Sequence, residues 1–160
     1  LGPEMKSTGE ALGSDVNLEK ALYKALVASG VSVPTHGNVL MTIDDENKQE
    51  ALQLAKRFAN IGYGIYATKG TADLFEAEGL YVHRASKIET EDGKNVVDII
   101  RNGRVNFVIN TMSNADGFLI RRVSAENNIS CMTSLDTANA LVKVLESLSF
   151  SMVSMNEMGK

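Results

Sequence analysis

Apolar residues in this chain form short continuous runs separated by longer stretches with helical spacing. The short runs predict strands, and the stretches in which apolar residues recur every three or four positions predict helices. We expect strands at residues 39–43, 64–68, 80–83, 105–110 and 129–132. We expect helices from residue 44 or 45 to Gly62, and at residues 71–78, 96–101, 116–127 and 136–148. This alternation predicts an α/β fold in which helices cover both faces of a five-stranded, mainly parallel sheet.

The strand at residues 105–110 is the most apolar of the five, and we expect it at the centre of the sheet. The order of the other strands cannot be predicted from the sequence. The first 37 residues follow a different pattern: residues 17–29 have an amphipathic helical pattern, and residues 30–37 predict a linker. The expected organisation is an N-terminal segment (1–13), a helix and linker (14–37), the α/β domain (38–150) and a C-terminal tail (151–160).

The composition narrows the class of protein. A net charge of −4 argues against nucleic-acid binding, which uses a basic face to contact phosphates. No apolar run reaches the roughly 20 residues of a membrane-spanning helix, so we expect no membrane partner. The start of the chain has no signal-peptide pattern, and its single cysteine fits a reducing cytoplasm. Because the chain does not start with methionine, we interpret it as a fragment of a longer protein.

Candidate chemistry lies where the predicted strands end. Ligands of an open parallel sheet bind at the carboxyl ends of the strands, where the chain turns into a helix. The turn Thr68-Lys69-Gly70-Thr71 offers two hydroxyls and the backbone N–H groups of a helix start, which can bind an anion. Further polar residues at the other turns are Lys48, Lys87, Asn110, Thr111 and Ser113. The spacing alone leaves two interpretations open, namely a phosphate site or ordinary helix caps with solvated lysines.

The sequence predicts no catalytic site and no metal site. His36 falls in the predicted linker and His83 in a strand, so they form no metal-binding pair at helical spacing. No nucleophile-elbow, P-loop or dinucleotide-binding motif is present. Cys131 falls in a predicted strand, where a small core residue is expected rather than a nucleophile. Arg121 and Arg122 are expected on an exposed helix face.

Four segments carry a resemblance to a known family. Residues 67–71 (Ala-Thr-Lys-Gly-Thr) and 108–111 (Val-Ile-Asn-Thr) resemble the methylglyoxal-synthase-like domain that ends the large subunit of carbamoyl phosphate synthetases. Residues 3–10 are similar to the end of that subunit's second synthetase domain, and residues 154–158 to its C-terminal tail. The resemblance implies a Rossmann-like three-layer sandwich with a parallel five-stranded sheet.

The resemblance also assigns roles to individual residues. Thr68 and Thr71 match the threonines that hold an effector phosphate, and Lys48, Lys87 and Asn110 match further effector contacts. A family hydroxyl is replaced by Met112, so that contact is either lost or shifted to Thr111 or Ser113. Cys131 stands where enteric enzymes place a tyrosine for ornithine, so ornithine control is not expected.

By resemblance, this domain is regulatory and binds a phosphorylated nucleotide-type effector such as UMP, IMP or PRPP. The parent enzyme makes carbamoyl phosphate from bicarbonate, glutamine-derived ammonia and ATP for pyrimidine and arginine synthesis. The implied partners are the synthetase domains of the same subunit, a small glutaminase subunit and a second copy of the chain. ATP and Mg or Mn are expected in the synthetase domains and no cofactor in this one.

The alternative is methylglyoxal synthase, a lyase that acts on dihydroxyacetone phosphate. Such enzymes resemble this domain but use an aspartate in a Gly-Gly-Asp turn and a histidine after the fourth strand. Residues 91–94 read Glu-Asp-Gly-Lys here, and residues 110–117 contain no histidine. A phosphate site without an acid and a base binds its ligand but does not turn it over. The related domain of the bifunctional purine-synthesis enzyme is disfavoured by both flanking segments.

Overall fold

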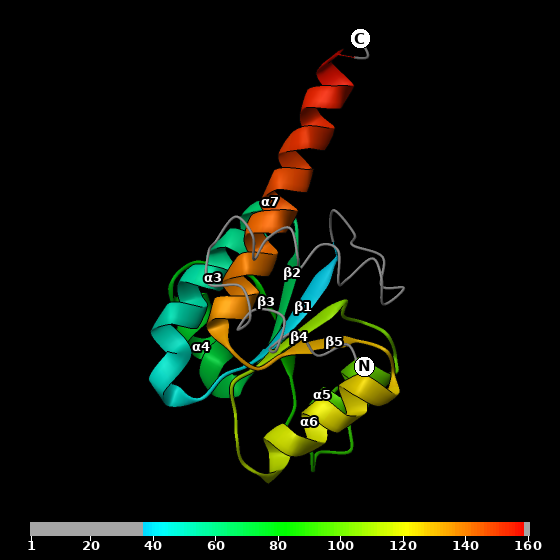
Figure 1. Cartoon of the computed structure of the whole chain (residues 1–160). Coiled ribbons are helices and arrows are strands. Elements are labelled where there is room, and N and C mark those ends of the chain that lie inside the picture. Colours follow the sequence, from blue (N-terminus) through cyan, green and yellow to red (C-terminus); the bar gives the residue numbers. More distant parts are fainter. Residues whose placement is uncertain (1–36, 159–160) are drawn as a thin grey trace.

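The computed structural model describes residues 37–158, with side chains described through residue 148. The chain forms one sheet of five parallel strands in the order β3-β2-β1-β4-β5 (Figure 1). The strands are β1 (Asn38–Thr42), β2 (Gly64–Thr68), β3 (Val82–Ala85), β4 (Phe107–Asn110) and β5 (Ser130–Met132). The helices are α3 (Lys48–Asn60), α4 (Lys69–Ala77), α5 (Val96–Arg101), α6 (Ala115–Glu126) and α7 (Leu135–Met158), and a 3₁₀ turn, η1 (Asp45–Asn47), precedes α3. The α/β fold with a parallel sheet is therefore confirmed.

The two faces of the sheet pack against different helices. Side chains of a strand point alternately to either face, so Val39 and Met41 lie on one side and Leu40 on the other. The first face packs against α3, α4 and α7, and the second against α5 and α6 (Figure 1). Because β1 and β4 are covered on both faces, apolar residues occupy most of their length. The helices on both faces were predicted from the sequence pattern.

The middle of the sheet is occupied by β1 rather than by β4. In the parallel register, Leu40 lies between Tyr66 of β2 and Val108 of β4. The prediction of residues 105–110 as the central strand was wrong by one position, because β4 is interior but has β5 as its other neighbour. Both strands are buried on two faces, so an apolar composition does not show which of them lies in the middle.

Several predicted boundaries differ from the structure; the strand expected at 105–110 begins at Phe107, and the helix expected at 71–78 begins at Lys69. The third strand begins at Val82 rather than at residue 80, because the N–H of Leu80 donates to the carbonyl of Phe75 and so closes the end of α4. The last helix continues to Met158 rather than ending at residue 148, since no glycine or proline interrupts it before Gly159. The predicted helix at 17–29 and linker at 30–37 lie outside the described residues, apart from Gly37.

Candidate functional site

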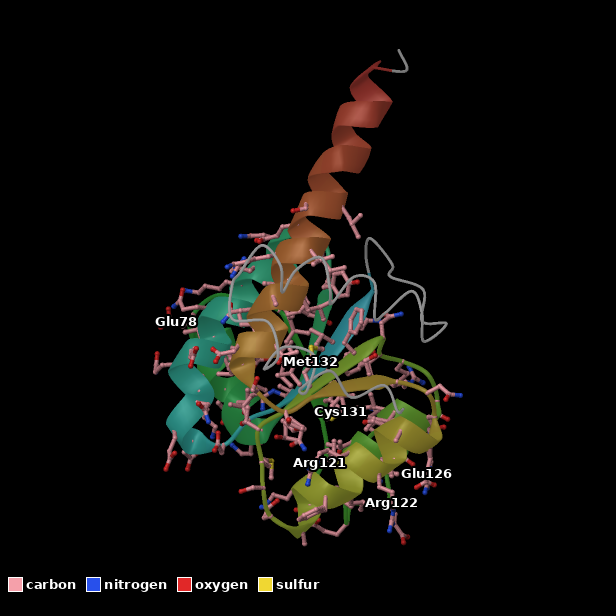
Figure 2. All side chains as sticks on the ribbon, viewed as in Figure 1. Glu78, Arg121, Arg122, Glu126, Cys131 and Met132 are labelled. Carbon is pink, nitrogen blue, oxygen red and sulfur yellow. The ribbon has the colours of Figure 1, made fainter. Side chains whose placement is uncertain are left out.

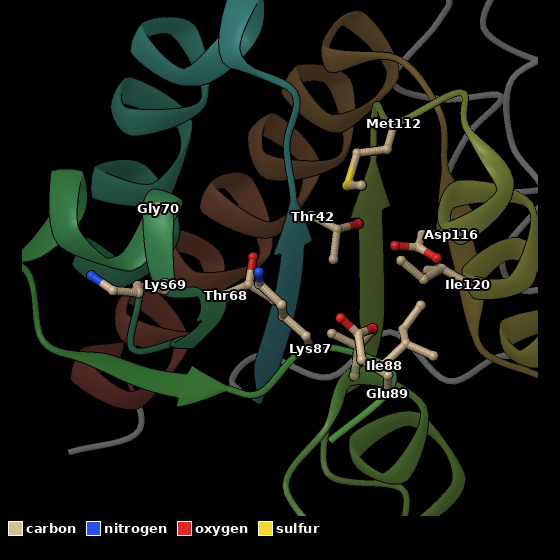
Figure 3. Close-up of a pocket in the computed structure, with 11 residues that line it drawn as sticks. Thr42, Thr68, Lys69, Gly70, Lys87, Ile88, Glu89, Met112, Asp116 and Ile120 are labelled. Carbon is tan, nitrogen blue, oxygen red and sulfur yellow. The ribbon is translucent and has the colours of Figure 1, made fainter. Parts of the chain in front are cut away.

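An open cavity of about 280 Å³ lies at the carboxyl edge of the sheet, on the face covered by α5 and α6 (Figure 3). Strands β1 and β2 end there, the first turn of α4 forms one wall, and the loop after β3 forms another. Its lining consists of Thr42, Thr68, Lys69, Gly70, Lys87, Ile88, Glu89, Val96, Met112, Asp116 and Ile120. The cavity therefore lies where parallel sheets bind their ligands.

The first turn of α4 presents backbone donors to this cavity. Thr68 is the N-cap residue of α4, and its side chain accepts no hydrogen bond from the helix. The helices on the other side of the cavity differ, because Asn95 caps α5 through the N–H of Asp98 and Asn114 caps α6 through the N–H of Gly117. The N-terminal N–H groups of α4 consequently lack a capping side chain, and the helix field at this end favours an anion.

Lys69 and Lys87, two of the lysines predicted to bind the phosphate, point in different directions. The Lys87 side chain points into the cavity in the direction of Thr68 (Figure 3). Among the described residues, no carboxylate lies within ion-pairing distance of Lys87. Lys69 is directed away from the other lining side chains, and its ammonium lies 3.1 Å from Asp73. Lys87 is therefore the lysine that can reach a ligand in this cavity without leaving a carboxylate.

Lys48 lies next to the cavity rather than in its lining. A Cβ atom added to Gly70 would come within 3.0 Å of Lys48 Nζ, so the ammonium occupies the space beside this glycine. Asp45 Oδ1 accepts a hydrogen bond from the same ammonium at 2.6 Å. Lys48 thus lies beside the first turn of α4, and Lys87 lines the cavity that this turn borders.

Asn110 is buried and forms part of the framework around the cavity. Its side chain is 1 % exposed; Oδ1 accepts hydrogen bonds from Thr42 Oγ1 at 2.9 Å and from the N–H of Met112 at 3.2 Å. Asn110 Nδ2 donates to the carbonyl oxygen of Gly117 at 3.0 Å. The amide therefore joins β1, β4 and α6, and it is not part of the cavity lining.

The remaining predicted residues do not line the cavity. Thr71 is 2 % exposed in the first turn of α4. Thr111 Oγ1 donates to Asp44 Oδ1 at 2.8 Å and accepts a hydrogen bond from the N–H of Asp44 at 3.0 Å, which joins the ends of β4 and β1. Ser113 is exposed in the loop before α6. The cavity thus brings together Thr68, Lys69, Gly70 and Lys87, and a role of the others in binding stays a prediction.

Sequence reasoning missed the apolar part of the cavity. Val96 and Ile120 belong to the faces that α5 and α6 turn toward the sheet, and Ile88 packs against the same core. Val96 and Ile120 carry the pattern of ordinary core residues, and Ile88 is a single apolar residue in a polar loop, so the sequence offers no signal that they line a cavity. Asp116, in the first turn of α6, and Glu89 add carboxylates to the lining.

The first residues of the polar loop at residues 87–94 form a wall of the cavity. The carboxylate of Asp92 accepts hydrogen bonds from the Ser86 hydroxyl and from the N–H of Lys94, which brings the two ends of the loop together. The Ser86 hydroxyl, followed by the Lys94 N–H, holds the pKa of Asp92 below its usual value. Asn95 Nδ2 also donates to the carbonyl oxygen of Thr90. The loop is therefore closed by specific contacts.

The cysteine and the two arginines considered in the sequence analysis, Cys131, Arg121 and Arg122, are not part of the cavity lining. Cys131 is buried on β5, in the core between the sheet and α6 (Figure 2). Arg122 Nε lies 3.4 Å from Glu126 Oε1 on the outer side of α6. The Arg121 guanidinium lies over the Phe118 ring at 4.5 Å from its centroid. Over the described part of the chain, no three His, Cys, Asp or Glu side chains are grouped closely enough to hold a metal ion. The described helices include none that is both long and apolar enough to cross a bilayer.

One comparison with known proteins places this geometry in a family. The family model described as "MGS-like domain" matches residues 50–133. The matched segment contains every residue of the cavity lining except Thr42. It also contains four of the five strands, so the match covers both the sheet and the site.

Proposed function

Because the chain belongs to the family of MGS-like domains, we propose that it binds a phosphorylated effector in the cavity at the carboxyl edge of the sheet. The observation that carries this proposal is the convergence of three positive groups. The uncapped first turn of α4 has the Lys48 ammonium beside Gly70, and it borders the cavity into which the Lys87 side chain points (Figure 3). A phosphate there would receive backbone N–H donors and charge-assisted hydrogen bonds from two lysines.

The rest of the cavity suits the organic part of such an effector. Ile88, Val96, Met112 and Ile120 supply an apolar surface, and Asp116 supplies an acceptor. A volume of about 280 Å³ fits a small ligand rather than a macromolecular segment. A nucleoside monophosphate combines the required anion with a flat, partly apolar base. UMP, IMP and the sugar phosphate PRPP are therefore the effectors to test.

The proposed parent is the large subunit of a glutamine-hydrolysing carbamoyl phosphate synthetase of the cytoplasm. Support comes from the similarity of residues 3–10 and 154–158 to the segments that flank the regulatory domain in that subunit. In such a protein, ATP and Mg or Mn would act in the synthetase domains, a small subunit would supply ammonia from glutamine, and this domain would be non-catalytic. Its partners would be the adjoining synthetase domains and a second copy of the chain.

Calorimetric titration of the 160-residue chain tests the proposal. We expect UMP, IMP or PRPP to bind at one site, and we expect no binding of ornithine because Cys131 replaces the tyrosine. Uridine serves as the matched ligand without phosphate, and it should bind much more weakly than UMP. Equal binding of UMP and uridine would contradict a phosphate site, and the absence of binding by all three phosphorylated ligands would contradict the effector role.

Methylglyoxal synthase is the second candidate, because Asp116 and Glu89 place carboxylates in the lining of the same cavity. Within the described lining, no histidine is available as the other partner in proton transfer. We therefore expect no methylglyoxal from dihydroxyacetone phosphate above a heat-inactivated control. Release that disappears in an Asp116→Asn variant would support the lyase instead.

A further inference from the structure

Lys48 combines its own positive charge with the positive N-terminal ends of two helices, α3 and α4. It is the first residue of α3, where the helix field is unfavourable for a cation. Its ammonium also lies beside Gly70 in the first turn of α4, where a second helix contributes positive potential. The Lys48 side chain is only 23 % exposed, so water compensates this charge in part. The arrangement therefore favours an anion close to Lys48.

Asp45 supplies that anion in the protein without ligand. Its Oδ1 lies 2.6 Å from Lys48 Nζ, and no other carboxylate of the described residues is within ion-pairing distance of Lys48. The hydrogen bond from Lys48, together with its charge, lowers the pKa of Asp45. The neighbouring carboxylates do not share this role, because Asp44 accepts hydrogen bonds from Thr111 and Asn47, and Glu46 has no ion pair among the described residues.

We propose that Asp45 is the resident counter-ion of the phosphate site, which an incoming phosphate replaces at Lys48. This inference rests on the proposed function. The Asp45 side chain is 93 % exposed, so it can turn into water without disturbing the core. A phosphate at the first turn of α4 would compete with the Asp45 carboxylate for the same ammonium and would be repelled by it. Asp45 therefore lowers the affinity for the effector.

Gly70 makes this arrangement accessible to experiment. The nearest atom to an added Cβ is the end of the flexible Lys48 side chain at 3.0 Å. Gly70→Ala should leave α4 intact and displace the Lys48 ammonium by a few tenths of an ångström. This variant changes the position of the charge and keeps every charged residue.

The test compares two variants that remove the same charge from the same turn. Asp45→Asn removes the counter-ion, and Glu46→Gln removes an exposed carboxylate that does not contact Lys48. In calorimetric titrations with UMP, we expect Asp45→Asn to bind about two- to fivefold more tightly than Glu46→Gln, the range that an exposed ion pair allows. The gain should be absent with uridine and in a Lys48→Met background, and Gly70→Ala should weaken UMP binding.

Carboxyl carbon NMR of Asp45 gives a readout that does not depend on changes in affinity. We expect the pKa of Asp45 to be below its usual range in the free chain and to rise toward that range in Lys48→Met and after saturation with UMP. Equal UMP affinity of Asp45→Asn and Glu46→Gln, or an Asp45 pKa unchanged by UMP, would overturn the counter-ion role while leaving the effector site in place. A wild-type chain that binds neither UMP nor inorganic phosphate would overturn the proposed function and this inference together.

Discussion

Thr42 and Asn110 connect the carboxyl ends of β1 and β4 through a hydrogen bond that is closed to water. The Thr42 hydroxyl donates to Asn110 Oδ1 at 2.9 Å, and both side chains are 1 % exposed. Through its Nδ2 atom, Asn110 also holds the carbonyl oxygen of Gly117 in the first turn of α6. One buried amide thus fixes the relative positions of the elements that carry Thr42, Met112 and Asp116 into the cavity.

Asn110→Ala should therefore destabilise the fold. Removing the amide leaves the buried Thr42 hydroxyl without its acceptor and takes one of two donors from the Gly117 carbonyl, which corresponds to about 1–3 kcal/mol. Urea unfolding measures the free-energy difference. The matched control is Asn60→Ala at the exposed end of α3, which should stay within about 0.5 kcal/mol of the wild type. Equal stability of the two variants would show that the amide does not hold the sheet edge together.

Two glycines near the cavity should respond oppositely to substitution by alanine. A Cβ at Gly117 would lie 2.1 Å from the backbone carbonyl oxygen of Met112, which cannot move without shifting the end of β4. We expect Gly117→Ala to lose about 1–3 kcal/mol or more, as overpacked sites do. Gly70→Ala meets only the end of the Lys48 side chain and should be no less stable than the wild type, because alanine favours the helix. Thermal unfolding of both variants checks this, and a stable Gly117→Ala protein would contradict the observed packing.

Asp92 makes the stability of the loop at residues 87–94 dependent on pH. The pKa of Asp92 in the folded protein is lowered by the Ser86 hydroxyl and the Lys94 N–H, so these contacts stabilise the folded state when the carboxyl is ionised. The contribution is present above the unfolded-state pKa of about 3.9 and is lost as the pH falls through the lower folded value. Asp92→Asn should therefore be less stable than the wild type at pH 7, with a difference that shrinks below about pH 4.

The control for this prediction is Glu91→Gln, which removes an exposed carboxylate from the same loop. Urea unfolding at pH 7 and pH 3 measures both variants. If Asp92→Asn and Glu91→Gln change stability equally at pH 7, the closure of the loop by Asp92 is not a stabilising contact.

The sequence predicted the sheet because each strand is a compact apolar run bounded by helix patterns. It could not distinguish β1 from β4 as the middle strand, since both are buried on two faces. The position of Leu80 was mistaken for strand because an apolar side chain suits both a strand and the hydrophobic contact that ends a helix.

The candidate site was predictable where backbone geometry dictates it. The turn at residues 68–71 had to lie at the carboxyl edge, and the structure places its first three residues in the cavity lining. Polarity alone could not tell a ligand-facing amide from a buried structural one, so Asn110 was expected in the lining and lies behind it. Ile120 has the pattern of a core residue and Ile88 is a single apolar residue in a polar loop, so their place in the lining depends on how the loop closes in three dimensions.

The most direct test of the effector site is calorimetric titration of UMP into Lys87→Met. Lys87 points into the cavity, so removing its ammonium takes a charge-assisted contact from the phosphate. We expect affinity to fall about ten- to a hundredfold, the effect of roughly 1.5–3 kcal/mol, with the fold intact. Lys56→Met, on α3 beside Glu78, is the matched control and should bind UMP as the wild type does. Equal UMP affinity of the Lys87→Met and Lys56→Met proteins would contradict the assignment of this cavity as the effector site.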